Sequence, residues 1–263
     1  MSTRRRRHNG WWTEQVGGMP LWGLAASAAF VVGILVWALL SMPDRVTADP
    51  NRELRPVPTF TQPSQPEQGT AFTMPEAGAP VYLIGDSWST GYSADPGQGY
   101  VDLLRAQTGW NITANAQTGT GYISVLADAG EPYPERVDDL PAETPSLVII
   151  QGGLNDEWGG GSEQVGDVAR PMIEATLARY PGAQVVLVGP ATAAWPVTET
   201  LVSIDKQLQG AAVAAGAWYV SPLSGEWVTE ENFSTFIDPE TIHPSNKGHA
   251  EYARRLIESL SAL

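Results

Sequence analysis

Cysteine is absent from the 263-residue chain, and basic residues are scarce. Without cysteine the chain has no disulfide bond, no thiolate metal site and no cysteine nucleophile. Lys and Arg number 15 against 29 Asp and Glu, so the formal net charge is -14. Phosphate binding needs clustered Lys and Arg, so we expect no nucleic acid among the partners.

Charged residues are also absent from residues 19–40, which are predominantly apolar. At ~1.5 Å per residue this run spans the ~30 Å hydrocarbon layer, which predicts a transmembrane helix. A buried helix of a soluble domain is the alternative, but such helices usually keep a polar face.

The flanking charges predict the orientation of this helix. Arg4 to Arg7 lie in residues 1–18, so the positive-inside rule predicts a basic cytoplasmic tail and an extracytoplasmic chain after Leu40. The competing interpretation is a signal peptide cleaved near Val46-Thr47-Ala48. The apolar run exceeds the ~7–15 residues of a signal peptide, which favours a retained single-pass anchor in the cell membrane.

Residues 41–79 predict an extracytoplasmic linker, since prolines are interspersed there with Thr, Gln and Glu and little apolar surface can be buried. A folded domain is expected over residues 80–263. Its continuous apolar runs predict buried parallel strands, and helical patterns separate them. Such alternation predicts a three-layer α/β/α domain with a parallel sheet. The expected strands are Val81–Ile84, Asn111–Asn115, Leu147–Gln151, Gln184–Val188 and Trp218–Val220, and the expected helices are Gly99–Thr108, Val165–Tyr180, Leu201–Ala215 and Lys247–Leu260.

Ser87 follows the first predicted strand in Gly85-Asp86-Ser87. A serine at the start of a helix has backbone N–H groups beside it, as a nucleophile requires. The alternative is an ordinary helix cap. The Gly-x-Ser-x-Gly pattern of α/β-hydrolases is absent here.

A serine nucleophile needs a base, and the chain has only three histidines. His8 lies on the predicted cytoplasmic side, and His249 falls inside the last predicted helix, where a packing role is expected. His243 lies in a turn before Pro244 and is the candidate base. Its orienting carboxylate is Glu240 by spacing, with Asp238 as the alternative.

Two further strand ends offer donors to a developing oxyanion. Asn155 follows Gly152-Gly153 after the third strand, and Gly119 and Gly121 follow the second. Ordinary turns are the alternative. A dinucleotide fingerprint is disfavoured, since Ser124 stands where its third glycine belongs.

Together these segments resemble the SGNH (GDSL-type) hydrolase superfamily over about residues 80–263. In that resemblance Ser87 matches the nucleophile and an oxyanion donor, Gly119 the second-block glycine, with Gly121 as the fallback, and Asn155 the side-chain donor. His243-Pro244 matches the end of the Asp-x-x-His-Pro block, but Glu240 replaces its aspartate, so the third triad member is Glu240 or Asp238.

The resemblance implies a flavodoxin-like fold and a lipase-like esterase that acts through an acyl-serine, without metal or organic cofactor. Small-molecule or carbohydrate esters are the expected substrates. The alternatives are an acyltransferase or deacetylase on cell-envelope carbohydrate, and an inactive domain that binds a glycan or a partner. Four tryptophans are equally suited to a substrate pocket or the core: Trp88, Trp158, Trp195 and Trp227.

Overall fold

The computed structural model describes residues 15–16, 19–20, 71–126 and 130–263. Within the first 58 residues it describes one short antiparallel pair, β1 (Gln15–Val16) with β2 (Met19–Pro20). Met19 and Pro20 are therefore in a strand, where the sequence predicts the start of a helix. Residues 21–40 lie outside the described residues, as does most of the predicted linker. Among the helices that are described, none has the length and apolar character needed to cross a bilayer.

Five parallel strands form the central sheet of the remaining chain, in the order β4-β3-β5-β6-β7. In chain order this is 2-1-3-4-5, the flavodoxin-like arrangement. Every predicted strand is confirmed to within a residue or two at its ends. Their bounds are β3 Pro80–Gly85, β4 Asn111–Ala116, β5 Leu147–Gln151, β6 Gln184–Val188 and β7 Trp218–Val220.

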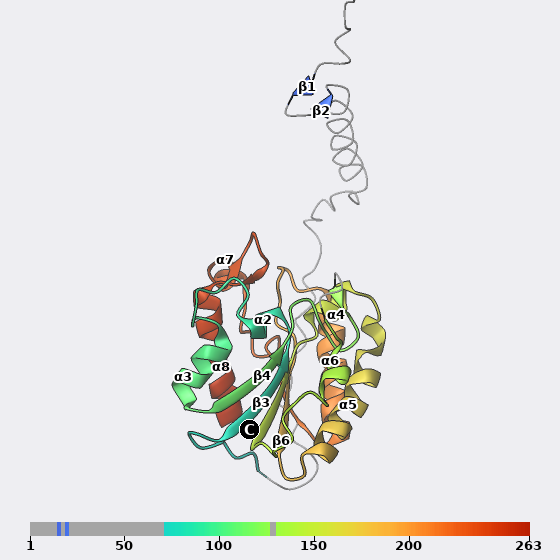
Figure 1. Ribbon diagram of the computed structural model, residues 1–263, viewed down its shortest axis with the longest axis vertical. Coiled ribbons are helices and arrows are strands. Elements are labelled where there is room, and N and C mark those ends of the chain that lie inside the picture. The colour runs from blue at the N-terminus through green and yellow to red at the C-terminus, as the bar shows by residue number, and fades with distance from the viewer. Residues whose placement is uncertain (1–14, 17–18, 21–70, 127–129) are drawn as a thin grey trace, which may run out of the picture. The chain divides into compact units, whose positions relative to one another are not determined.

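Helices cover both faces of the sheet and make three layers (Figure 1). One face carries α3 (Tyr100–Thr108) and α8 (Asn246–Ser261), and the other carries α5 (Val165–Arg179) and α6 (Glu199–Ala215). The predicted α/β/α architecture is thus observed. Shorter elements complete the fold: α2 Ser87–Thr90, η3 Tyr133–Arg136, α4 Leu154–Trp158, η4 Ser162–Gln164, α7 Glu230–Phe236, β8 Ile237–Asp238 and β9 His243–Pro244.

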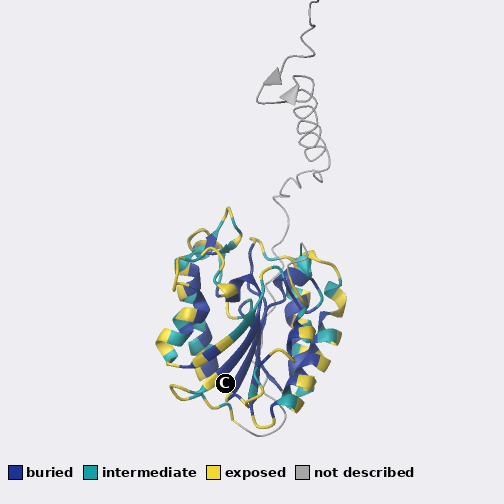
Figure 2. Ribbon diagram, in the orientation of Figure 1, coloured by how far each residue is buried: buried dark blue, intermediate teal, exposed yellow. Residues whose placement is uncertain are grey.

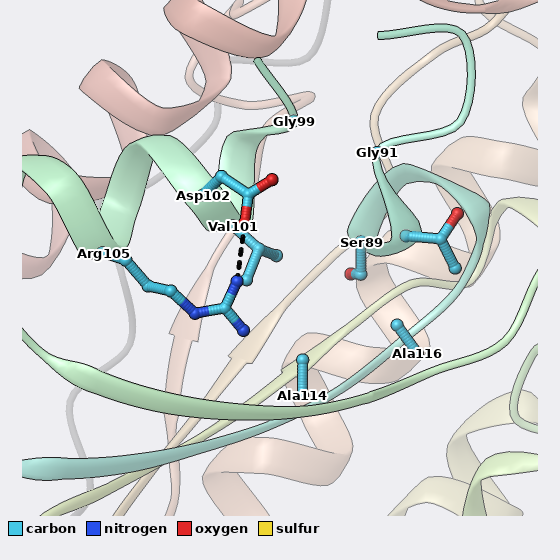
Figure 3. Close-up of a pocket in the computed structure, with 9 residues that line it drawn as sticks. Ser89, Gly91, Gly99, Val101, Asp102, Arg105, Ala114 and Ala116 are labelled. Carbon is cyan, nitrogen blue, oxygen red and sulfur yellow. Dashed lines mark hydrogen bonds and ion pairs between the residues drawn. The ribbon is translucent and has the colours of Figure 1, made fainter. Parts of the chain in front are cut away.

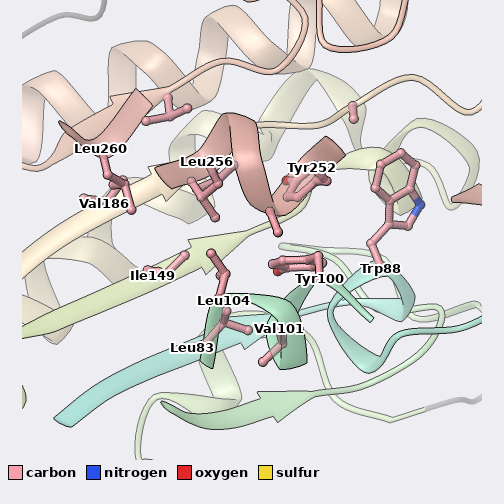
Figure 4. Packing of buried hydrophobic residues seen from close by; sticks show 14 of the residues in the cluster. Leu83, Trp88, Tyr100, Val101, Leu104, Ile149, Val186, Tyr252, Leu256 and Leu260 are labelled. Atoms are coloured by element: carbon pink, nitrogen blue, oxygen red, sulfur yellow. The ribbon is translucent and has the colours of Figure 1, made fainter. Parts of the chain in front are cut away.

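The core lies on both sides of the sheet because alternate strand residues face opposite layers. Ile149 packs with the α3 and α8 side, whereas its neighbour Ile150 packs with the α5 and α6 side. Both side chains are fully buried, and β5, the middle strand of the sheet, is buried along its whole length (Figure 2). In the first cluster Leu83 and Ile149 meet Leu104 and Leu256 from the two helices (Figure 4).

The folded part of the chain begins earlier than the sequence predicts. The Phe72 ring packs edge-on against Trp218 at 5.9 Å, and the Thr73 backbone exchanges two hydrogen bonds with the Gln184 side chain. The Trp110 indole N–H donates to the Pro75 carbonyl at 2.9 Å. Residues 72–75, which the proline pattern assigns to the linker, are therefore packed on the domain by these aromatic and polar contacts.

We expect Ile149→Ala to destabilise the domain by about 2–5 kcal/mol, because it removes a buried side chain from the central strand and leaves a cavity. Urea unfolding followed by circular dichroism measures this change. The matched control is Thr113→Ala on the exposed face of the edge strand β4, which should change the unfolding free energy by less than about 0.5 kcal/mol. Equal effects of the two substitutions would contradict the packing described here.

Candidate active site

Ser87 is placed by a tight junction between β3 and α2. Asp86 caps the short helix, since its Oδ1 accepts the N–H of Trp88 at 2.9 Å. Ser87 is the first helical residue and is only 4% exposed. The junction requires glycine at position 85, because a Cβ there would lie 2.0 Å from Ser89 Oγ. The local sequence therefore holds the Ser87 hydroxyl at the carboxyl edge of the sheet, where ligands bind in folds of this class.

His243 comes from the carboxyl-terminal part of the domain sequence and lies next to Ser87 in the fold. It lies on β9, which pairs with β8 in a small antiparallel hairpin that places Asp238 opposite His243. The imidazole Nε2 is 2.8 Å from Ser87 Oγ. Folding thus brings together the two groups that the sequence predicts as nucleophile and base, although 156 positions separate them.

The Nδ1 of His243 lies 2.6 Å from the backbone carbonyl oxygen of Thr241. A carbonyl only accepts hydrogen bonds, so Nδ1 carries the hydrogen and Nε2 is left free to accept the Ser87 proton. The sequence predicts a carboxylate for this orienting contact. Thr241 was missed because a backbone acceptor has no residue-type signature.

The two candidate carboxylates lie close to His243 along the chain but make other contacts. Asp238 Oδ1 accepts the N–H of Glu240 at 2.9 Å, and Glu240 is exposed. Among the described residues, neither carboxylate forms a hydrogen bond with the imidazole. Burial lowers the pKa of His243 below its usual value, while the Thr241 carbonyl and the negative charge of Asp238 raise that pKa in opposition. Asp238 is therefore the carboxylate that acts on His243 through its charge.

The predicted oxyanion donors lie at the carboxyl ends of three neighbouring strands. Gly119 adopts a left-handed conformation with φ of 75° in the loop after β4, and its N–H has no hydrogen-bond partner among the described residues. The N–H of Gly121 instead donates to the Ser124 carbonyl at 2.8 Å, which favours Gly119 over Gly121 as a donor. As the first residue of α2, Ser87 has an N–H outside the helical hydrogen-bond ladder.

Asn155 links the third strand end to the glycine loop. Its side chain is buried in α4, and Nδ2 donates one hydrogen to the Thr120 carbonyl at 2.8 Å. A side-chain amide carries two hydrogens, so one remains for a substrate oxygen. The contact also positions Thr120, which follows Gly119 directly.

Asp156 holds the remainder of that loop. Its carboxylate accepts the N–H groups of Tyr122, Ile123 and Ser124 at 3.0, 2.8 and 3.0 Å. A Cβ at position 121 would lie 2.4 Å from Asp156 Oδ2, so the loop can approach this closely only with glycine there. Burial raises the pKa of Asp156, and the three N–H donors lower it in opposition.

A buried arginine lies beneath the site, and no feature of the sequence predicts it. Arg136 of η3 donates to the carbonyl oxygens of Gly85 and Asn115 at 3.1 and 3.2 Å, and to Thr120 Oγ1 at 3.2 Å. It therefore connects the ends of β3 and β4 with the glycine loop. Burial raises the pKa of Asp86 to about 7, and the Trp88 N–H and the Arg136 charge oppose that rise.

The second candidate histidine and the four tryptophans considered for a substrate pocket lie partly in the core and partly on the surface. His249 is fully buried in α8, and Trp88 and Trp227 are buried against Tyr252. Trp158 and Trp195 remain 47% and 41% exposed. No group of three or more His, Asp or Glu side chains arranged to hold a metal occurs in the described part of the chain.

A pocket of about 250 Å³ opens beside α2, between α3 and the edge strand β4. Ala114 and Ala116 of β4 face it from one side, and the Asp102–Arg105 ion pair of α3 lines the other (Figure 3). Thr90, three residues after Ser87 on α2, also lines it. Residues three apart are neighbours on a helix surface, so this pocket lies about one helical turn from the Ser87 side chain.

Comparison with known proteins supports the fold and identifies the family. The chain is 25% identical over 194 residues to the GDSL lipase Rv0518 of Mycobacterium tuberculosis, an overlap of 69% of this chain and 81% of that one. A carbohydrate esterase family 2 enzyme of Corynascus thermopiles matches the fold with a TM-score of 0.58 and 19% identity, over 72% of this chain and 68% of its own. The esterase EstA of a Pseudoalteromonas species matches with a TM-score of 0.53 and 15% identity, over 70% and 97%. The GDSL-like lipase/acylhydrolase family model matches residues 83–251, more than half of the chain. The chain belongs to this family and is a serine hydrolase of ester bonds.

Proposed function

We propose that Ser87 is the nucleophile of this ester hydrolase and that His243 is its general base. The observation that carries the proposal is the 2.8 Å contact between Ser87 Oγ and His243 Nε2. The Nδ1 contact to Thr241 selects the tautomer in which Nε2 accepts a proton. Burial supports the same assignment, since it keeps the imidazole neutral to lower pH.

In the proposed reaction Ser87 Oγ attacks the ester carbonyl carbon while its proton passes to His243 Nε2. The carbonyl oxygen becomes an oxyanion that the N–H groups of Ser87 and Gly119 and the Asn155 side chain hold. Collapse of this intermediate breaks the bond to the alcohol, which leaves with the proton from His243. The acyl-serine is then hydrolysed by water, whose proton His243 accepts and returns to Ser87 Oγ as the acid departs.

The imidazolium formed in each step needs a negative or acceptor group behind it. The Thr241 carbonyl touches Nδ1 directly, and Asp238 contributes through its charge from the opposite strand of the hairpin. We therefore propose Asp238, rather than Glu240, as the third member of the catalytic group. Glu240 is exposed, and no hydrogen bond joins it to the imidazole among the described residues.

Small-molecule or carbohydrate esters are the substrates we propose. Trp158 lies three residues after Asn155 on α4, and its side chain is exposed. Trp195 is also exposed, and Thr198, three residues later in the chain, donates its hydroxyl hydrogen to the Glu157 carboxylate of α4. Exposed aromatic rings are suited to contacts with apolar groups or sugar faces. The same site would transfer the acyl group to a sugar hydroxyl if that hydroxyl outcompeted water.

We also propose that residues 19–40 anchor the enzyme in the cell membrane as a single-pass helix. The supporting features are the uncharged apolar run and the arginines at positions 4–7. In this arrangement residues 1–18 are cytoplasmic and the hydrolase domain is extracytoplasmic.

Ser87→Ala should lower kcat/KM for a short acyl ester by at least about 10³-fold, because no other group forms the acyl-enzyme. Hydrolysis of p-nitrophenyl acetate measures the rate, and mass spectrometry after fluorophosphonate treatment should find the label on Ser87. The matched control is Ser146→Ala, which replaces an exposed serine just before β5. This variant should hydrolyse the ester and take up the fluorophosphonate label as the unmodified enzyme does. Undiminished hydrolysis by Ser87→Ala would exclude the proposed nucleophile.

The pH dependence of kcat/KM should show which of the two carboxylates, Asp238 or Glu240, acts on His243. His243 must be neutral to accept a proton, so kcat/KM falls as the pH drops through its pKa. Asp238→Asn removes the charge that raises this pKa, so the acid limb should move to lower pH and kcat should fall. Glu240→Gln should leave both unchanged. The reverse result, with the effects at Glu240 alone, would assign the role to Glu240.

Membrane anchoring predicts that the full chain stays with the membrane fraction in alkaline carbonate, whereas a chain lacking residues 1–40 is released. The mass of the recovered protein provides the second measurement, since a retained anchor preserves the amino terminus. A mature chain that begins after Ala48 would instead establish a cleaved signal peptide.

A further inference from the structure

The segment between α2 and α3, residues 91–99, runs beside the catalytic histidine. Its second residue, Tyr92, donates its backbone N–H to the carbonyl of Ser87 at 3.0 Å. The Tyr92 ring lies against the imidazole of His243, with centroids 4.5 Å apart and planes 43° apart. This ring is 48% exposed, so its position on the imidazole is not imposed by burial in the core.

His249 joins the two ends of this segment from the buried face of α8. Its Nδ1 accepts the N–H of Tyr100 at 3.3 Å, and its Nε2 lies 3.3 Å from the carbonyl oxygen of Tyr92. The first contact needs a bare Nδ1 and the second needs a hydrogen on Nε2, so both form together only with a neutral ring. Burial lowers the pKa of His249, which keeps the ring in that state.

A second tie holds the middle of the segment to the same helix. The N–H of Asp95 donates to Asn246 Oδ1 at 2.9 Å, and Asn246 Nδ2 returns a hydrogen bond to the Asp95 carboxylate at 2.6 Å. Asn246 opens α8 and follows the His243-Pro244-Ser245 turn closely. The segment and the histidine turn are thus fastened to one helix, which fixes their relative position.

We propose that Tyr92 is a positioning residue that holds the His243 imidazole toward Ser87, and that His249 sets the place of Tyr92. The proposal rests on the catalytic roles assigned above to Ser87 and His243. Contact with one face of the imidazole limits rotation of the ring away from the serine.

The contact has a measurable consequence for the titration of His243. The Tyr92 ring removes water from one face of the imidazole, and such burial lowers the pKa. The charged and titratable groups that also act on His243 are Asp238 of β8, which raises its pKa, and the neighbouring His249 of α8. Loss of the Tyr92 ring exposes the imidazole and should raise its pKa toward the usual value.

Tyr92→Ala should lower kcat by about 10-fold or more with little change in KM, because the base is misplaced while substrate contacts remain. The acid limb of kcat/KM should move to higher pH. Histidine ring NMR, simple in a chain with three histidines, should show the same rise in the pKa of His243 without any need for turnover. Tyr92→Phe should retain most of the activity, since the Tyr92 hydroxyl forms no hydrogen bond with any described residue.

His249 is tested by a matched pair. Gln at position 249 can place its amide nitrogen near the Nε2 position and donate to the Tyr92 carbonyl, whereas Asn is too short. His249→Asn should therefore lower kcat more than His249→Gln, and the double variant with Tyr92→Ala should be no slower than Tyr92→Ala alone. Gln98→Ala, an exposed position on the same segment, is the control for general effects on the loop.

Wild-type kcat and an unmoved His243 pKa in Tyr92→Ala would overturn the inference, while Ser87-dependent hydrolysis would leave the proposed function intact. Activity that survives Ser87→Ala would overturn the proposed function, and the NMR titration would still decide whether Tyr92 shields His243. Thermal unfolding verifies that each variant is folded. Tyr92→Leu replaces the alanine variant if the latter unfolds, and the same shifts are expected of it.

Discussion

The hydrogen bond between Ser87 and His243 is the interaction on which the proposed function of this fold depends. A serine hydroxyl is a weak nucleophile until a base accepts its proton, and the base must lie within about 3 Å to do so. Here the two groups are 2.8 Å apart. Ser87 opens the short helix that follows the first strand of the central sheet, and His243 lies just before the final helix. The packed sheet and helices therefore hold these two groups, which are far apart in the sequence, within hydrogen-bonding distance.

Several buried polar groups hold the strand ends and the glycine loop beside that contact. Arg136 ties the carbonyls of Gly85 and Asn115 to Thr120, and Asp156 gathers three backbone N–H groups of the glycine loop. Asn155 binds the Thr120 carbonyl from α4. Buried polar groups are costly unless they are paired, so these contacts leave the loop little freedom to move. These contacts thus hold in place the loop that carries Gly119, one of the proposed oxyanion donors.

The histidine side of the site is built differently. Its hairpin is short and exposed at Glu240, and it is steadied from outside by the Tyr92 ring and by α8. The orienting contact is a backbone carbonyl, with Asp238 acting at a distance through its charge. Glu240 occupies the position where the family pattern has aspartate, and in this arrangement the imidazole keeps its tautomer without a carboxylate contact.

The sequence by itself determined the strands, the four long helices and the residues that could form a hydrolytic site. Those features follow from local order: continuous apolar runs predict buried strands, and glycine next to Asp, Ser or Asn marks their ends. Only the tertiary structure decided the partner of His243 Nδ1, the roles of Arg136 and Tyr92, and the division of the tryptophans between core and surface. Each of these depends on residues far apart in the chain or on backbone atoms that every residue carries. Spacing along the sequence therefore does not predict these contacts. The packing of the layers determines which groups meet.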